Sequence, residues 1–180
     1  FWVRRYIHDY SLKKEHEPET TKIIEANVKP GDKVLDIGAS FGYFTLLMSK
    51  LVGKQGQVYS VEPNQKHFKY LCENLVLNEY GNIRPYLMAA WDFEGVVSIP
   101  AGRGFGTKKH IKVNSFRLDN ILTEERVNKI DFVKIDVDGC EPKVLRGMEA
   151  LIKRSPDMKM VIEFFPKYLG RYQRLCGMLR

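Results

Sequence analysis

A short apolar segment, Lys33–Ile37, leads directly into a glycine-containing turn and then into an apolar stretch, Tyr43–Val52, that stops at Gly53. The first segment is typical of a buried strand and the second of a helix. Another segment of strand length, Gln57–Val61, follows a glycine-rich turn. A strand, a helix and a second strand in this order form a βαβ unit, whose two strands are parallel. The chain is therefore expected to fold around a parallel sheet.

The rest of the chain continues this alternation. Main strands are predicted at residues 83–90, 130–137 and 159–165, shorter extended segments at 96–100 and 111–118, and helices after Asn64, after Pro142 and over 168–179. Strands that alternate with helices of about 10 to 15 residues predict an α/β fold, a doubly wound, mostly parallel Rossmann-like sheet with helices on both faces. We expect an N-terminal segment at residues 1–22 and one folded domain at residues 23–180.

Composition excludes several classes of protein. A chain of 180 residues with 44% hydrophobic residues can build one core without disulfides or metals. No apolar run reaches the roughly 18 residues that span a bilayer, so we expect no membrane span and a cytoplasmic location. Three cysteines without C-x-x-C spacing predict neither a disulfide framework nor a zinc site. The sequence leaves the oligomeric state open.

Ligands of an open parallel sheet bind beyond the carboxyl ends of its strands. Asp36, Gly38 and Gly42 lie where the first predicted strand ends, and Glu62 directly follows the second. The turn lacks the G-x-G-x-x-G pattern that clears space for a pyrophosphate, which disfavours a nicotinamide-dependent oxidoreductase. A carboxylate at Asp36 would repel a phosphate but suits a ligand that carries an ammonium and a sulfonium. Glu62 can accept hydrogen bonds from both hydroxyls of a ribose.

S-adenosylmethionine has these groups and no phosphate, so the strand ends predict it as the cofactor. The third predicted strand ends in Ala90 and Trp91. The small alanine side chain can admit the edge of an adenine to the backbone, and the tryptophan can cover its ring.

Five segments of the chain resemble the FkbM family of S-adenosylmethionine-dependent methyltransferases. They are HEPETT (16–21), VLDIGASFGYFTLL (34–47), VYSVEPN (58–64), VKIDVDGCEPKVLRGM (133–148) and VIEFFP (161–166). The fourth is the most specific, although Asp138 stands where the family more often has Glu. The resemblance implies a class I methyltransferase fold, normally of seven strands, and methylation of a hydroxyl oxygen on a small molecule or glycan.

The residues at the strand ends and this resemblance together give the expected cofactor contacts. They are Asp36, Gly38, Ala39, Ser40, Gly42, Tyr43, Phe44, Glu62, Pro63, Ala90, Trp91 and Asp136.

Three charged residues are candidates for the chemical step. Methyl transfer is an in-line displacement, so the protein must align donor and acceptor and take up the proton of the hydroxyl. Asp136 is the candidate base, with a hydrogen bond to the loop or to the amino group of the cofactor as the alternative role. Lys134 lies on the same side of the strand, and Glu163 is expected to be partly buried and paired with it. Glu141 fits better as the anion at a helix start.

A metal centre is not expected, because a hard cation needs more oxygen ligands than these carboxylates supply. The four histidines show no H-x-x-x-H spacing. Two other functions remain open. An RNA methyltransferase would use the net charge of +7, although the basic residues are scattered along the chain, and residues 103–109 are expected to form a solvated loop. A terminal antiparallel pair of strands is not visible before Arg180. A domain that binds a nucleoside or a protein without catalysis would fit the absence of these strands.

Overall fold

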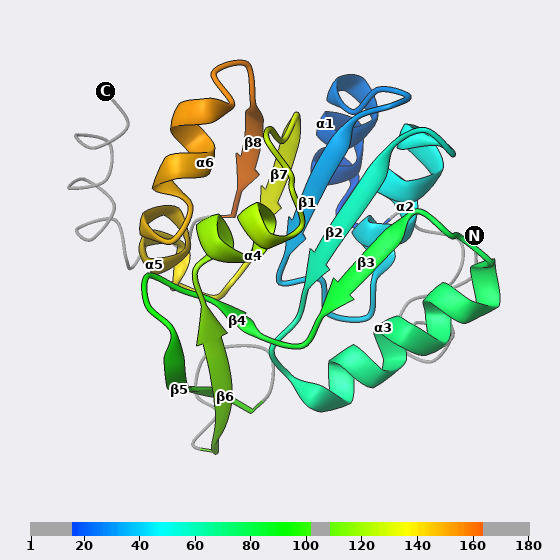
Figure 1. The fold of residues 1–180 in the computed structure, drawn as a ribbon. Helices are drawn as coiled ribbons and strands as arrows, with labels where there is room; N and C mark the ends of the chain where they lie inside the picture. The colour runs from blue at the N-terminus through cyan, green and yellow to red at the C-terminus, as the bar shows by residue number, and fades with distance from the viewer. Residues whose placement is uncertain (1–15, 102–108, 164–180) are drawn as a thin grey trace.

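The central feature of the chain is a five-stranded parallel sheet in the order β3-β2-β1-β7-β8 (Figure 1). The computed structural model describes residues 16–101 and 109–163. The strands are β1 (Lys33–Ile37), β2 (Gln57–Val61), β3 (Ile83–Tyr86), β7 (Phe132–Ile135) and β8 (Lys159–Ile162). The first strand, β1, lies in the middle of the sheet. β2 and β3 follow on one side of it, and β7 and β8 lie on the other side. This confirms the predicted doubly wound, mostly parallel α/β fold.

Helices cover both faces of the sheet because successive strand residues point to opposite sides. Val34 packs with α1 (Pro18–Asn27) and α2 (Tyr43–Val52) in one buried cluster. Leu35 packs in the other cluster with α4 (Leu118–Glu124), α5 (Glu141–Arg146) and α6 (Glu149–Arg154). The longest described helix, α3 (Gln65–Asn78), follows β2. Within the described ranges, none of these helices has the length and apolar character needed to cross a membrane.

A second, three-stranded sheet stands beside the first in the order β4-β6-β5. It contains β4 (Ala89–Ala90), β5 (Gly95–Pro100) and β6 (His110–Phe116), and β5 and β6 form an antiparallel hairpin. The prediction of one strand over residues 83–90 is therefore wrong. β3 stops at Tyr86, whose carbonyl accepts from the Glu62 amide just past the end of β2, and the chain then pairs with β6 through the Trp91 amide and the Phe116 carbonyl (2.9 Å).

The single helix predicted after Pro142 is also wrong, because it is divided into α5 and α6. A Cβ on Gly147 would lie 2.0 Å from the Trp91 carbonyl oxygen, so the chain at this point packs directly against the residue that follows β4. The Asp119 carboxylate then accepts hydrogen bonds from the amides of Ala150 (3.1 Å) and Leu151 (2.8 Å), which starts a new helix.

The sequence analysis also missed α4, and it made two strands too long. The strand predicted at 130–137 is shorter in the structure, where β7 covers four residues. Glu163 was placed within the strand predicted at 159–165 but comes directly after β8. Residues 164 and 165, the predicted helix at 168–179, residues 1–15 and most of the predicted loop at 103–109 lie outside the described residues.

The glycine turn after β1 is held tightly against β7. Gly38 has a φ of 85°, and its amide and that of Ala39 donate to the Val61 carbonyl. A Cβ on Gly38 would lie 1.9 Å from the Asp136 carbonyl oxygen. Gly42, with a φ of 89°, begins α2 where a Cβ would meet Leu71 at 2.5 Å. Only glycine fits these two positions, so the turn is fixed between β2 and β7.

We expect Gly38→Ala to lower the free energy of unfolding by about 3 kcal/mol or more, since it adds a clash to an unfavourable φ. Gly31→Ala is the matched control, because Gly31 has a φ of 90° but open space around an added Cβ. That variant should lose only about 1 kcal/mol. Denaturant unfolding measures both, and equal losses would show that the contact with Asp136 is unimportant.

Candidate functional site

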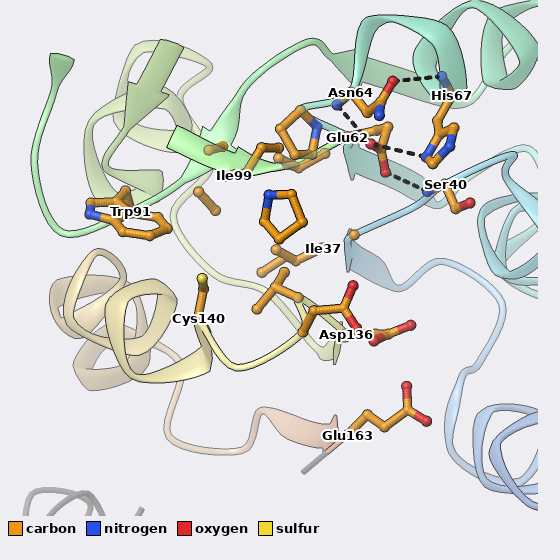
Figure 2. Close-up of a pocket in the computed structure, with 18 of the residues that line it drawn as sticks. Ile37, Ser40, Glu62, Asn64, His67, Trp91, Ile99, Asp136, Cys140 and Glu163 are labelled. Atoms are coloured by element: carbon orange, nitrogen blue, oxygen red, sulfur yellow. Dashed lines mark hydrogen bonds and ion pairs between the residues drawn. The ribbon is translucent and has the colours of Figure 1, made fainter. Parts of the chain in front are cut away.

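A cavity of about 330 Å³ lies beyond the carboxyl ends of the central strands (Figure 2). Ile37 and Gly38 line it from the end of β1, Glu62 from the end of β2, and Asp136 from the end of β7. This is the edge of the sheet where ligands of doubly wound proteins bind. The sequence prediction and the cavity therefore identify the same region.

Glu62 forms a fixed acceptor on the cavity wall. Its side chain is buried, and its carboxylate accepts hydrogen bonds from the backbone amides of Ser40 (2.8 Å) and Asn64 (2.8 Å). The His67 Nδ1 atom lies 3.7 Å from the same carboxylate. Both carboxylate oxygens are therefore held in fixed positions on the wall of the cavity. Figure 2 shows Ser40, Glu62, Asn64 and His67 gathered on one side of the cavity.

Apolar residues form another part of the wall. Ala89, Ala90 and Trp91 contribute from β4 and its end, and Ile99 and Pro100 from β5. The Asn64 side-chain amide donates to the Ala101 carbonyl (3.1 Å), which ties the hairpin to the loop after Glu62. A flat apolar group, such as a purine base, could pack in this part of the cavity.

Asp136 and Lys134 form an ion pair at the end of β7. The Lys134 ammonium is buried, lies 3.7 Å from the Asp136 carboxylate and 4.9 Å from the centre of the Phe44 ring. The expected ion pair of Lys134 with Glu163 is not formed. The Lys134 ammonium instead pairs with Asp136, which directly follows β7. Lys134 thus holds the carboxylate of Asp136 beside the cavity.

Glu163 lies next to Asp136 at the end of the neighbouring strand β8. The Glu163 amide donates to the Ile135 carbonyl (2.9 Å), and its carboxyl group lines the cavity beside that of Asp136. Partial desolvation, followed by the effect of the neighbouring Asp136 carboxylate, raises the pKa of Glu163 to about 7. Near neutral pH this carboxyl group can therefore gain or lose a proton.

Asp36 occupies a different position from the other predicted contacts. It is 1% exposed, accepts a hydrogen bond from the Thr45 hydroxyl (2.6 Å) and does not line the cavity. Burial raises the pKa of Asp36, against the opposing effects of Lys134 and the hydrogen bond from Thr45. Asp36 therefore lies beneath the glycine turn, inside the fold.

The predicted residues fall into three groups. The main cavity is lined by Gly38, Ser40, Glu62, Pro63, Ala90, Trp91, Asp136 and Glu163. A small adjoining cavity, which Gly38 and Asp136 also line, adds Ala39, Tyr43, Phe44 and Lys134. Asp36 and Gly42 line neither.

Glu141 holds the loop between β7 and α5 in place from inside the fold. Glu141 is fully buried, and its carboxylate accepts from the amides of Gly139 (3.1 Å) and Val137 (3.4 Å). It begins α5, in agreement with its predicted role as an anion at a helix start. Asp138, within the loop, has a φ of 51° and lines the cavity.

The sequence analysis missed several lining residues, of which Glu17 is the most informative. Five non-glycine residues in the described ranges have a positive φ, and three of them, Glu17, Ser40 and Asp138, line this cavity. Such conformations cost energy and are concentrated at functional sites. The HEPETT segment was the available signal for Glu17, but its position depends on the packing of α1. Within residues 16–101 and 109–163, no group of three or more His, Cys, Asp or Glu side chains could hold a metal ion.

Comparisons with known proteins identify a methyltransferase family. The model of the methyltransferase FkbM domain matches residues 36–175. A probable cobalt-precorrin-6B C(15)-methyltransferase (decarboxylating) of Saccharolobus solfataricus is 40% identical over 185 residues, which cover 83% of this chain and 91% of the relative. For two other curated relatives, the aligned region covers only 24% and 21% of the relative's length.

Two solved structures share the fold. A methyltransferase FkbM from Methylobacillus flagellatus KT has a TM-score of 0.57 at 17% identity, covering 79% of this chain and 39% of that one. The fibrillarin of Aeropyrum pernix, in complex with natively bound S-adenosyl-L-methionine, has a TM-score of 0.57 at 20% identity, covering 90% of this chain and 63% of its own. The chain thus spans less than two thirds of either solved chain.

The raised pKa of Glu163 predicts a pH dependence of stability. The pKa rises from 4.5 to about 7 on folding, so the protonated group favours the folded state. That contribution is complete below a pH of about 4.5 and is lost as the pH rises through about 7. We therefore expect the wild type to lose melting temperature relative to Glu163→Gln between about pH 5 and pH 8.

Glu149→Gln, an exposed glutamate in the first turn of α6, is the control and should follow the wild type at every pH. A constant difference between wild type and Glu163→Gln across this pH range would contradict the shifted pKa.

Proposed function

Because the chain belongs to the FkbM methyltransferase family, we propose that it transfers the methyl group of S-adenosylmethionine to a hydroxyl oxygen on a small molecule or glycan. One observation carries this proposal: a single cavity has the fixed carboxylate of Glu62 on one wall and the carboxylate of Asp136 on another. The two residues come from the ends of different strands, on either side of the glycine turn. A cofactor held at Glu62 can therefore extend toward Asp136.

The lining residues fit the parts of the cofactor. Glu62 would accept hydrogen bonds from the ribose hydroxyls, and the base would pack between Ala90 and Ile99. The methionine part would run past Gly38, which lines the cavity at the end of β1. Asp36 was expected to bind the ammonium, but because it is buried under the turn we propose that it supports the turn through Thr45.

Asp136 is placed to manage the proton of the acceptor. S-adenosylmethionine would supply an electrophilic methyl carbon when bound. Asp136 would accept the proton of the hydroxyl as the oxygen attacks, and Lys134 would keep its carboxylate oriented. Glu163, whose carboxyl group lies beside that of Asp136, would receive or share that proton. We therefore assign Asp136 as the base and Lys134 and Glu163 as the residues that position it.

The other two functions considered make different predictions. An RNA methyltransferase would transfer label to RNA, and a domain without catalysis would bind the cofactor and transfer nothing. Methyl transfer from labelled cofactor across glycans, small alcohols and RNA separates the three. Incorporation into a hydroxyl of a glycan or small alcohol is the outcome we expect.

We expect Glu62→Ala to weaken binding of S-adenosylmethionine by about 1 to 3 kcal/mol, because charge-assisted hydrogen bonds to the ribose are lost. Stability should fall as well, since the carboxylate also holds the Ser40 and Asn64 amides. Calorimetry at a temperature where the variant is folded measures the affinity. Glu73→Ala, on α3 and outside the cavity, should bind normally. Unchanged affinity in Glu62→Ala would remove the ribose contact.

Asp136→Asn tests the chemical step, because it removes the charge with little change of shape. Turnover should fall about 100-fold or more while cofactor affinity changes little. The exposed Asp157→Asn provides the control and should keep full turnover. If cofactor affinity fell together with the rate, Asp136 would instead hold the ammonium of the cofactor.

A further inference from the structure

Asn64 contacts three separate parts of the cavity wall. It lines the cavity and is 9% exposed, and its backbone amide donates to the Glu62 carboxylate (2.8 Å). Its side-chain oxygen accepts from the amides of Lys66 (3.0 Å) and His67 (3.4 Å), which caps α3 (Figure 2). Its side-chain nitrogen donates to the Ala101 carbonyl (3.1 Å). Asn64 therefore joins the loop after β2, the start of α3 and the hairpin of β5 and β6.

The end of the hairpin that Asn64 contacts lies far from the strand that anchors it. β4 pairs with β6 at Ser115 and Phe116, whereas Pro100 and His110 pair about 17 Å further along the hairpin. Val97 and Ser115 are the buried residues of the two hairpin strands, and the other positions are exposed or half-buried. Core packing therefore does little to fix the far end, which makes the hydrogen bond from Asn64 important for its position.

This far end of the hairpin forms part of the apolar wall of the cavity. Ile99 and Pro100 line the cavity and directly precede Ala101, whose carbonyl accepts the hydrogen bond from Asn64. An apolar wall contributes to binding when it stays in contact with the ligand, because a gap of about 0.5 to 1 Å already loses about a quarter to a half of the dispersion energy. Small displacements of this wall would therefore weaken a packed base.

We propose that Asn64 is a positioning residue for the cofactor. Its side-chain nitrogen holds the wall of Ile99 and Pro100 against the base, while its backbone amide holds the carboxylate of Glu62 for the ribose. This inference rests on the proposed function, because it takes the base to lie between Ala90 and Ile99. The side-chain oxygen caps the helix and the side-chain nitrogen holds the hairpin, so substitutions can separate the two roles.

Asn64→Asp and Asn64→Ser both remove the donor to Ala101 but keep an oxygen that caps a helix as well as Asn does. Both variants should bind S-adenosylhomocysteine about threefold to tenfold more weakly than the wild type, as measured by calorimetry below their melting temperatures. The uncharged Ser variant shows that the loss does not come from the added charge of Asp. The affinity for 5′-methylthioadenosine, which contains adenosine but lacks the amino acid part, should fall by the same factor.

Asn27→Asp is the matched control, because the Asn27 side chain also donates to a backbone carbonyl, that of Ile23 (2.8 Å), and lies outside the cavity. It should bind both ligands as the wild type does. Melting curves establish that all three variants are folded.

Wild-type affinity in Asn64→Asp or Asn64→Ser would show that Asn64 serves only as a helix cap, so the inference would be wrong while the proposed function stands. A loss for S-adenosylhomocysteine without a loss for 5′-methylthioadenosine would place the effect at the methionine end and would also contradict the inference. If the wild type binds neither ligand, the cofactor assignment fails and the inference fails with it.

Discussion

Parallel pairing of β1 with β2 on one side and β7 on the other is the constraint on which the site depends. It brings the carboxyl ends of three strands to one edge of the sheet, so that Glu62, Gly38 and Asp136 line a single cavity. The contact is so close at Gly38 that a side chain there would overlap the Asp136 carbonyl. The cavity wall at Glu62 and the proposed base Asp136 are therefore positioned by the same glycine turn.

A buried charge network connects this edge of the sheet to its core. Lys134 lies beside Asp36 in the register of β1 and β7, and its ammonium pairs with Asp136. Asp36 in turn holds Thr45 in the first part of α2. Removing one member of such a network leaves an uncompensated buried charge, which is expensive. This explains how charged residues inside the fold can support the turn and orient the proposed base.

Local patterns in the sequence predicted what depends on local structure. The first βαβ unit, the glycine turn and the strand-end position of Glu62 follow from short apolar runs and their punctuation. The break between β3 and β4 did not, because it depends on where β2 ends and on pairing with β6. Asp36 was predicted at the cavity but lies beneath the turn, and Glu17 was missed because its place depends on packing between α1 and α2. Sequence patterns locate residues along a strand, whereas burial and distant partners decide which of them face the cavity.

A crystal structure of the chain with S-adenosylhomocysteine tests the central claim most directly. The account predicts one ligand in the cavity, with its ribose hydroxyls on the Glu62 carboxylate, its base between Ala90 and Ile99, and its sulfur facing Asp136. A ligand bound outside this cavity, or bound within it with its ribose away from Glu62, would contradict the account.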